Sequence, residues 1–261
     1  MILEASNIWK SYVRSPLGKS IDHSGLENPP KVITKRFSSD NALHVLKGID
    51  LRIQKGEVIS VVGPSGAGKS TLLHILGGLD KPDQGTVRLD GEDVYRLSDA
   101  KRARVRNDKV GFVFQFYHLL PEFTALENVF LPRMIQQPHG RKRQFEYEGL
   151  ALLERVGLKE RAQHKPYQLS GGEQQRAAIA RALINKPAIV FCDEPTGNLD
   201  SHSGREIIRL LVEINTSNGQ TVVIVTHDER VAAQSHRIIY IKDGELDKKP
   251  ATVNQPLSID R

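Results

Sequence analysis

One glycine-rich run, residues 63–70, constrains the fold of this chain most strongly. It reads Gly-Pro-Ser-Gly-Ala-Gly-Lys-Ser. The preceding apolar residues Val58–Val62 predict a buried strand, and Ser70–Leu76 predicts a helix. Glycines at such a junction let backbone N–H groups point inward at phosphate oxygens, and the helix N-terminus adds its positive end. This full match to the P-loop pattern, between a strand and a helix, favours a phosphate site over an ordinary glycine-rich turn.

The rest of the chain alternates strand-like and helical segments, which predicts an α/β fold with a mostly parallel sheet. Helices are expected at Arg143–Val156 and Glu173–Leu183. Further strands are expected at Val110–Phe114, Ala188–Cys192, Thr221–Val225 and Ile238–Ile241. A length of 261 residues suits one large domain, so we expect a single domain over residues 1–261.

Composition narrows the class of protein. No apolar run approaches the roughly 18 residues of a spanning helix, and the first residues have no secretion-signal pattern. A single cysteine, Cys192, leaves no internal disulfide. The net charge of +6 comes partly from basic runs at residues 101–106 and 141–143. These runs favour a solvated surface over attraction to anionic lipid or nucleic acid, and charge alone does not choose a partner. Because no aromatic residues are interleaved, no nucleic-acid partner is expected.

Residues 13–41 break the pattern. They contain Pro16, Pro29 and Pro30 among scattered serine, glycine and charged residues. The composition predicts a long surface insertion, with a short strand considered at Lys31–Thr34. It carries none of the residues expected to perform chemistry.

A second motif supplies carboxylates. The apolar run Ile189–Cys192 ends in Asp193 and Glu194. Beside a P-loop, Asp193 is expected to bind Mg²⁺ together with Ser70, and Glu194 to polarise an attacking water. Lys69 is expected to reach the β- and γ-phosphates. The residues expected to hold the nucleotide phosphates are Gly63, Pro64, Ser65, Gly66, Ala67, Gly68, Lys69, Ser70 and Thr71.

Residues 169–176, Leu-Ser-Gly-Gly-Glu-Gln-Gln-Arg, resemble the signature sequence of ABC ATPases. Three further elements follow the family's order: Gln115 after a strand, the run Gly197–Asp200, and His227 after a strand. The resemblance implies that ATP and Mg²⁺ are the cofactors. It implies that Gln115 contacts Mg²⁺ and the nucleophilic water, and that His227 contacts the γ-phosphate.

The family resemblance also implies an assembly and an architecture. Two subunits would form a head-to-tail homodimer, in which Ser170, Gly171, Gly172 and Asp200 complete the site of the other subunit. The implied fold is a P-loop NTPase with a RecA-like, mostly parallel core and an antiparallel β subdomain. A helical subdomain is expected at about residues 116–172.

The adenine platform has two candidates. ABC ATPases usually stack the base on an aromatic side chain near the first strand. Tyr12 fits by its place at the end of that strand, and Phe37 fits by its distance from the P-loop. The insertion leaves both open, and Tyr12 is favoured.

The apolar and aromatic segment Phe116–Val129 is expected to receive a cytoplasmic helix of an integral membrane permease. Packing against the protein's own core is the rival explanation. This segment and residues 72–80 resemble the ATPases of lipoprotein-releasing systems, which implies a peripheral protein on the cytoplasmic face of the inner membrane. Macrolide-exporter ATPases and a regulatory cell-division ATPase are the alternatives. A soluble ABC ATPase acting on DNA or ribosomes would usually carry two such domains or a long coiled coil.

Overall fold

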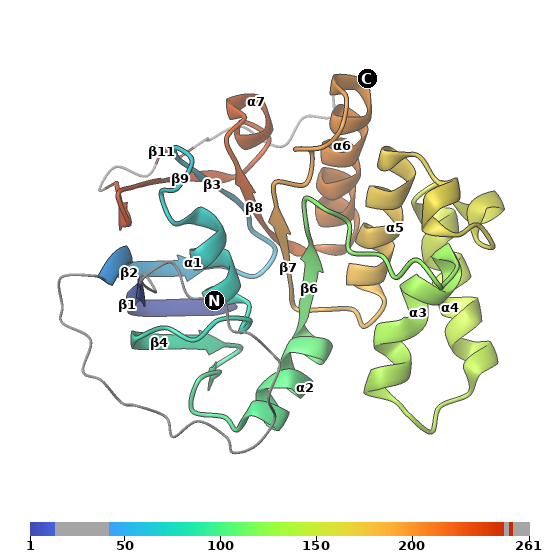
Figure 1. Cartoon of the computed structure of the whole chain (residues 1–261), viewed down its shortest axis with the longest axis horizontal. Coiled ribbons are helices and arrows are strands. Elements are labelled where there is room, and N and C mark those ends of the chain that lie inside the picture. The colour runs from blue at the N-terminus through green and yellow to red at the C-terminus, as the bar shows by residue number, and fades with distance from the viewer. Residues whose placement is uncertain (14–41, 248–250, 253–261) are drawn as a thin grey trace, which may run out of the picture.

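The computed structural model describes residues 1–13, 42–247 and 251–252, and its described chain forms two sheets and a group of helices (Figure 1). The strands are β1 (Leu3–Val13), β2 (Ala42–Ile53), β3 (Val58–Val62), β4 (Gln84–Leu89), β5 (Glu92–Asp93), β6 (Val110–Val113), β7 (Ile189–Asp193), β8 (Thr221–Thr226), β9 (Arg237–Lys242), β10 (Glu245–Leu246) and β11 (Ala251–Thr252). The α-helices are α1 (Lys69–Leu76), α2 (Asp99–Lys109), α3 (Ala125–Gln136), α4 (Lys142–Arg155), α5 (Gly171–Leu183), α6 (Ser201–Asn218) and α7 (Glu229–Ala232). Short 3₁₀ turns are η2 (Lys159–Arg161) and η3 (Pro166–Gln168).

The larger sheet has the order β10-β9-β3-β8-β7-β6, with β11 also paired to β9. Every pair from β9 to β6 is parallel, which confirms the predicted mostly parallel sheet. Strands β3 and β8 are buried along their whole length, as expected for central strands covered on both faces. Because these strands run in one direction, their carboxyl ends meet at one edge. The P-loop, Gln115, Glu194 and His227 all follow such ends.

The smaller sheet is antiparallel, with the order β2-β1-β4-β5. Strands β1 and β2 pair as far as Val13 and Ala42. The predicted insertion therefore enters and leaves at the end of this hairpin. Apart from Val13, the insertion lies outside the described residues, as do the strand considered at Lys31–Thr34 and the candidate Phe37.

Helix α1 lies between the two sheets, and the main hydrophobic cluster forms around it. Its buried side chains Leu72, Leu73, Ile75 and Leu76 pack with residues of both sheets. The helix that follows the P-loop is thus fixed from both sides, which holds the glycine-rich loop in place.

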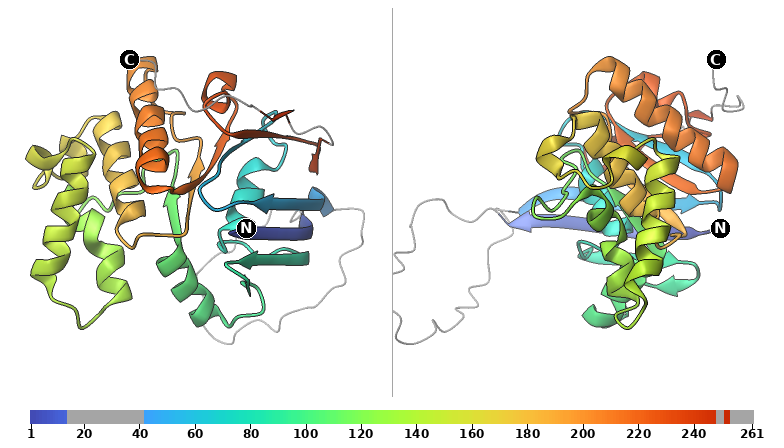
Figure 2. Two further views of the ribbon diagram at one scale, coloured as in Figure 1. Left: turned by 180° about the vertical axis from the view of Figure 1, so that it is seen from behind. Right: turned by 90° about the vertical axis from the view of Figure 1, so that its right-hand side faces the viewer.

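Helices α3 and α4, with α5 beside them, form the end of the molecule farthest from the antiparallel sheet (Figures 1 and 2). A separate hydrophobic cluster joins them, including Val129, Phe145 and Leu153. Helix α3 begins with a capping box formed by Thr124 and Glu127. Among the helices that the structure describes, none combines the length and the apolar character needed to cross a bilayer.

Candidate active site

The P-loop is a compact turn closed around its own lysine. Gly66 and Gly68 have φ values of 78° and 99°, a region that favours glycine. The buried Lys69 Nζ donates to the carbonyls of Gly63, at 2.8 Å, and Pro64, at 2.9 Å. A Cβ on Gly63 would lie 2.0 Å from the Ile241 carbonyl oxygen, so this glycine is required by the adjacent strand. The loop therefore presents backbone amides and the positively charged ammonium group of Lys69, a combination that suits polyphosphate.

Two oxygen ligands face each other beside this loop. The Ser70 hydroxyl, on α1, donates to the Asp193 carboxylate, at the end of β7, over 2.9 Å. The imidazole of His74 lies 3.9 Å from the same carboxylate. A hydroxyl and a carboxylate are hard oxygen ligands of the kind that Mg²⁺ takes, so Ser70 and Asp193 fit the expected cation.

Glu194 and His227 come from neighbouring strands. The Glu194 carboxylate and His227 Nδ1 are hydrogen-bonded at 2.6 Å. Glu194 has a φ of 46°, and its amide donates to the Val225 carbonyl, which fixes the chain as it leaves β7. An unusual backbone conformation at a carboxylate in such a position is typical of functional sites. This geometry is compatible with the expected general base, Glu194, held by a hydrogen-bonded partner.

The signature residues lie at the start of α5. Ser170 is the N-cap of this helix and forms a capping box with Glu173. In the described chain, no hydrogen bond or ion pair joins Ser170, Gly171 or Gly172 to the P-loop of the same subunit. A Cβ on Gly171 would lie 2.8 Å from the Tyr117 hydroxyl and 3.2 Å from Leu199, so the signature contacts the loops that follow Gln115 and Glu194.

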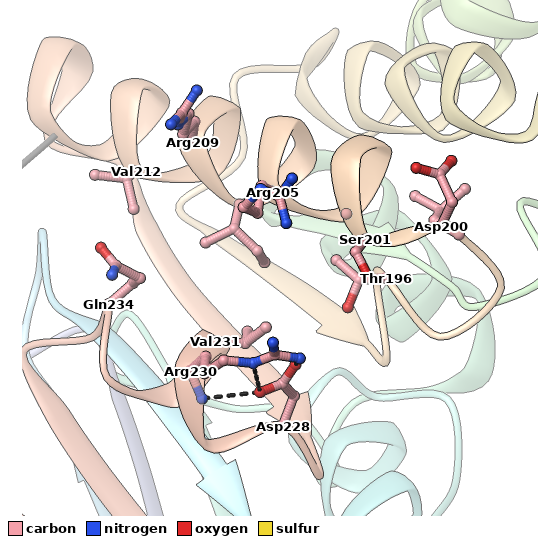
Figure 3. Close-up of a pocket in the computed structure, with 13 residues that line it drawn as sticks. Thr196, Asp200, Ser201, Arg205, Arg209, Val212, Asp228, Arg230, Val231 and Gln234 are labelled. Atoms are coloured by element: carbon pink, nitrogen blue, oxygen red, sulfur yellow. Dashed lines mark hydrogen bonds and ion pairs between the residues drawn. The ribbon is translucent and has the colours of Figure 1, made fainter. Parts of the chain in front are cut away.

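Asp200 is the N-cap of α6. Its carboxylate accepts from the amides of His202, at 2.9 Å, and Ser203, at 3.0 Å. Hydrogen bonds from Ser203 and the helix amides lower the pKa of Asp200 to about 2. A pocket of about 410 Å³ lies beside it between α6 and α7, and Figure 3 shows Arg205 and Arg209 on one side. Of the predicted site residues, only Asp200 lines this pocket.

Tyr12 lies next to the P-loop helix. Its hydroxyl donates to Asp80, at 2.7 Å, and hydrogen-bonds the Thr71 side chain. Burial, and then the Asp80 carboxylate, raise the pKa of Tyr12. Lys10 Nζ donates to the other Asp80 oxygen and lies 5.0 Å from the centre of the Tyr12 ring. Tyr12 is 43% exposed, so part of this residue remains accessible.

Several residues of this region were not predicted from the sequence. Lys10 and Asp80 hold Tyr12, and Asn198 is hydrogen-bonded to Gln115. Asn198 lies within the run 197–200 that carried the family resemblance, so the motif itself was a signal. Asp80 lies in the run 72–80 that also carried the resemblance, but nothing in the sequence indicated its contact or that of Lys10 with Tyr12, because these contacts depend on how the antiparallel sheet meets α1.

The profile of the family described as ABC transporter matches residues 46–197. The chain belongs to the ABC transporter family of ATP-binding proteins. This ABC ATPase is 56% identical over 209 residues to the lipoprotein-releasing system ATP-binding protein LolD of Shewanella frigidimarina, covering 80% of this chain and 86% of the relative. It is 52% identical over 214 residues to LolD of Bacteroides fragilis, covering 82% of this chain and 97% of the relative.

Solved structures agree with the fold. The ATP-binding cassette MJ0796, in a dimeric post-hydrolysis state bound to ADP and Pi, superposes with a TM-score of 0.81 at 39% identity. The match covers 97% of this chain and all of MJ0796. The predicted P-loop NTPase fold is therefore confirmed, and the chain is an ATP-binding ABC ATPase.

Proposed function

We propose that this ABC ATPase hydrolyses ATP as a homodimer to drive the release of lipoproteins from a membrane by a permease partner. The observation that carries the proposal is its 56% identity to a LolD protein over most of both chains. The relatives reported above carry the lipoprotein-releasing name, so the macrolide-exporter and cell-division alternatives are not favoured.

The site supports hydrolysis of the γ-phosphate. Lys69 and the P-loop amides bind phosphate oxygens, and Glu194 accepts the proton of the attacking water at its carboxylate. His227, hydrogen-bonded to Glu194 at 2.6 Å, keeps that carboxylate oriented and contacts the γ-phosphate. Ser70, Asp193 and Gln115 would hold Mg²⁺, which neutralises charge on the β- and γ-phosphates when bound.

The homodimer follows from the position of the signature. Ser170 begins a helix whose N-terminal amides suit an anion, yet it has no hydrogen bond to the P-loop in the described part of its own subunit. A second subunit in head-to-tail orientation brings Ser170, Gly171 and Gly172 to the γ-phosphate of the first, and Asp200 to the same interface. Each dimer then has two such composite sites.

We infer that the permease contact lies beside Gln115. A groove of about 520 Å³ runs between α2, β6, α3 and α5, and His118, Ile135 and Arg181 contribute to its lining. Phe116 is 66% exposed and Leu120 is 40% exposed; they do not line the groove, but each is two residues from His118, which does. Leu119, by contrast, packs against the core of the helical region. The proposed contact therefore uses Phe116 and Leu120, while Leu119 supports the fold.

The groove also has a charge preference. Arg106 and Arg181 line it, and none of its lining residues in the described part of the chain is acidic. The Arg181 guanidinium donates to the carbonyl oxygens of Tyr117, at 2.7 Å, and His118. Burial lowers the pKa of Arg181 to about 10. An apolar helix carrying a carboxylate fits this surface, on the cytoplasmic face of the inner membrane.

The function is tested by depleting the protein in its own cells and following the location of outer-membrane-type lipoproteins. The proposal expects them to accumulate in the inner membrane and to be released again by the wild-type chain. It also expects rescue to fail with Glu194→Gln. Normal lipoprotein sorting in depleted cells would contradict the substrate while leaving the ATPase intact.

A matched pair of variants tests the permease contact. Leu120→Asp should keep basal ATP hydrolysis and lose membrane recruitment, whereas Leu120→Met should keep both. The thermal midpoint of unfolding is measured in parallel to show that Leu120→Asp folds. Normal recruitment of folded Leu120→Asp to membranes that contain the partner would reject this surface.

A further inference from the structure

Two loops from neighbouring strands are joined by a reciprocal pair of amide hydrogen bonds. The Gln115 side-chain Nε2 donates to Asn198 Oδ1 over 3.2 Å, and Asn198 Nδ2 donates to the Gln115 backbone carbonyl over 3.1 Å. The two residues are 83 positions apart in sequence. Asn198 therefore holds both the backbone and the side chain of Gln115.

The loop that carries Asn198 is hydrogen-bonded to the backbone of Glu194. The Gly197 amide donates to the Glu194 carbonyl over 3.0 Å, which closes a tight turn between them. A Cβ on Gly197 would lie 2.8 Å from Gln115 Nε2, so only glycine leaves room for the amide in this position. Asn198 thus stands at a defined place relative to Glu194.

The side chain of Gln175 also joins the same two loops, from the buried side. The fully buried Gln175 donates through Nε2 to the Pro195 carbonyl at 2.7 Å, and to the Phe114 carbonyl at 3.4 Å. Pro195 lies within the turn that precedes Asn198, and Phe114 directly precedes Gln115. The backbone beneath the amide pair is therefore held independently of Asn198.

The direction of the hydrogen bond matters for the chemistry of Gln115. A carboxamide has a donor end and an acceptor end, and only its carbonyl oxygen can bind Mg²⁺. Asn198 accepts from the nitrogen end. In the described chain, no hydrogen bond uses Gln115 Oε1. The carbonyl oxygen is the end left available as a cation ligand.

We propose that Asn198 is a positioning residue for Gln115, which orients the Gln115 carboxamide so that its carbonyl oxygen is presented as a ligand for the cation bound with ATP. The inference rests on the proposed role of Gln115 as a cation ligand. It adds that the loop following Glu194 sets the orientation of that ligand. Residues that orient metal ligands typically change metal affinity by roughly 10- to 100-fold when removed.

The test measures cation binding without hydrolysis. In the Glu194→Gln background, binding of a fluorescent ATP analogue is titrated with Mn²⁺, and the half-maximal Mn²⁺ concentration is recorded. Asn198→Ala should raise that concentration by about 10-fold. Asn198→Asp should raise it as well, because a carboxylate cannot donate to the Gln115 carbonyl. The control His202→Ala should leave it unchanged, because the bond from His202 to Asp200 uses the backbone amide.

A double variant separates positioning from general structure. In a Gln115→Ala background, adding Asn198→Ala should change the half-maximal Mn²⁺ concentration by no more than about twofold, because the residue it acts through is gone. If Asn198→Ala raised the half-maximal Mn²⁺ concentration as much in the Gln115→Ala background as in its absence, the inference would be overturned. It would also be overturned if folded Asn198→Ala alone left that concentration unchanged. If Gln115→Ala itself left Mn²⁺ dependence unchanged, the cation role of Gln115 would fail and this inference with it. The proposed role in lipoprotein release is tested by the separate depletion experiment, so a failure of the Gln115 cation role would not by itself contradict it.

Discussion

The Glu194 carboxylate and the His227 imidazole lie 2.6 Å apart although 33 residues separate them in the chain. The contact exists because β7 and β8 are adjacent parallel strands, so the residues that follow them leave the sheet at the same edge. The Glu194 side chain is 18% exposed, whereas that of His227 is 70% exposed. The carboxylate is therefore the more buried member of the pair, and the imidazole is the more exposed one.

Glu194→Gln should bind ATP normally and lose hydrolysis. Glutamine can still hydrogen-bond water and His227 but is a poor proton acceptor, so turnover should fall by about 10²- to 10⁴-fold. Lys69→Ala should instead weaken ATP binding itself, because the substitution removes the positively charged side chain inside the P-loop. Nucleotide binding and phosphate release are measured on both variants. Parental turnover in Glu194→Gln would show that another group is the base.

ATP should convert the Glu194→Gln variant from monomer to dimer. Without hydrolysis, the composite sites between Lys69 of one subunit and Ser170 of the other stay occupied. Light scattering coupled to gel filtration measures the mass with and without ATP. Adding Ser170→Arg should prevent the dimer, because a bulky side chain would stand where the γ-phosphate approaches the signature. A monomer at saturating ATP and high protein concentration would argue against head-to-tail assembly.

Tyr12 should contribute to ATP affinity through its ring rather than its hydroxyl. Tyr12→Ala should raise the Kd for ATP by roughly 2- to 10-fold, as expected for the loss of one aromatic stacking contact. Tyr12→Phe keeps the ring and should stay within about twofold of the parent by the same argument. Titration of a fluorescent ATP analogue measures both variants. Equal losses in the two would show that the hydrogen bond to Asp80 is what matters.

Asp80 should stabilise the fold only while it is ionised. Partial burial raises its pKa, but hydrogen bonds from Lys10 and Tyr12 outweigh this, and the net pKa lies below the ordinary carboxyl value. Because the folded-state pKa is depressed, the stabilisation is complete above the unfolded value, about 3.9. It is lost as the pH falls through the folded value. Urea unfolding at pH 7 should show Asp80→Asn to be less stable by roughly 1 kcal/mol.

The pH dependence of the stability difference distinguishes an effect of the Asp80 charge from an effect of packing. The difference between Asp80→Asn and the parent should stay constant from pH 7 to pH 5 and shrink below about pH 4, where the carboxylate of the unfolded parent begins to take up protons before that of the folded parent does. Asp50→Asn, on the antiparallel sheet, serves as a control, because the Asp50 carboxylate accepts a hydrogen bond from the Asn7 backbone amide. A difference that did not vary between pH 5 and pH 3 would point to packing rather than charge.

The insertion should be dispensable for ATP binding and hydrolysis. It joins the ends of β1 and β2, which pair as far as Val13 and Ala42, so a short connection can still close the hairpin. Loop closure free energy changes slowly with length, so replacing residues 15–34 by a Gly-Ser link should have little effect on stability. Thermal unfolding and ATP titration measure the variant. Loss of nucleotide binding in a folded variant would place part of the insertion at the adenine.

Local sequence was sufficient for the elements whose signals are contiguous. The strand Val58–Val62 agrees with its prediction at both ends, and the P-loop and the capping boxes at Thr124 and Ser170 are also found as local pattern indicates. Helix α4 and strands β6, β7 and β9 differ from the predicted bounds by only one residue at either end. These features depend on periodicity, glycine and capping residues within a few positions of one another, so a single stretch of chain contains the information.

Tertiary structure decided which distant residues meet. Ser70 faces Asp193 because α1 and the end of β7 lie at the same edge of the sheet, and Asn198 reaches Gln115 because β6 and β7 are parallel neighbours. Leu119 and Leu120 are adjacent and equally apolar, yet one packs inside the helical region and the other remains exposed. Strand order and helix packing are set by the free energy of the whole core, to which every segment contributes. No local pattern encodes strand order or helix packing. The contacts of Gln115 and Tyr12 could therefore be identified only from the tertiary structure.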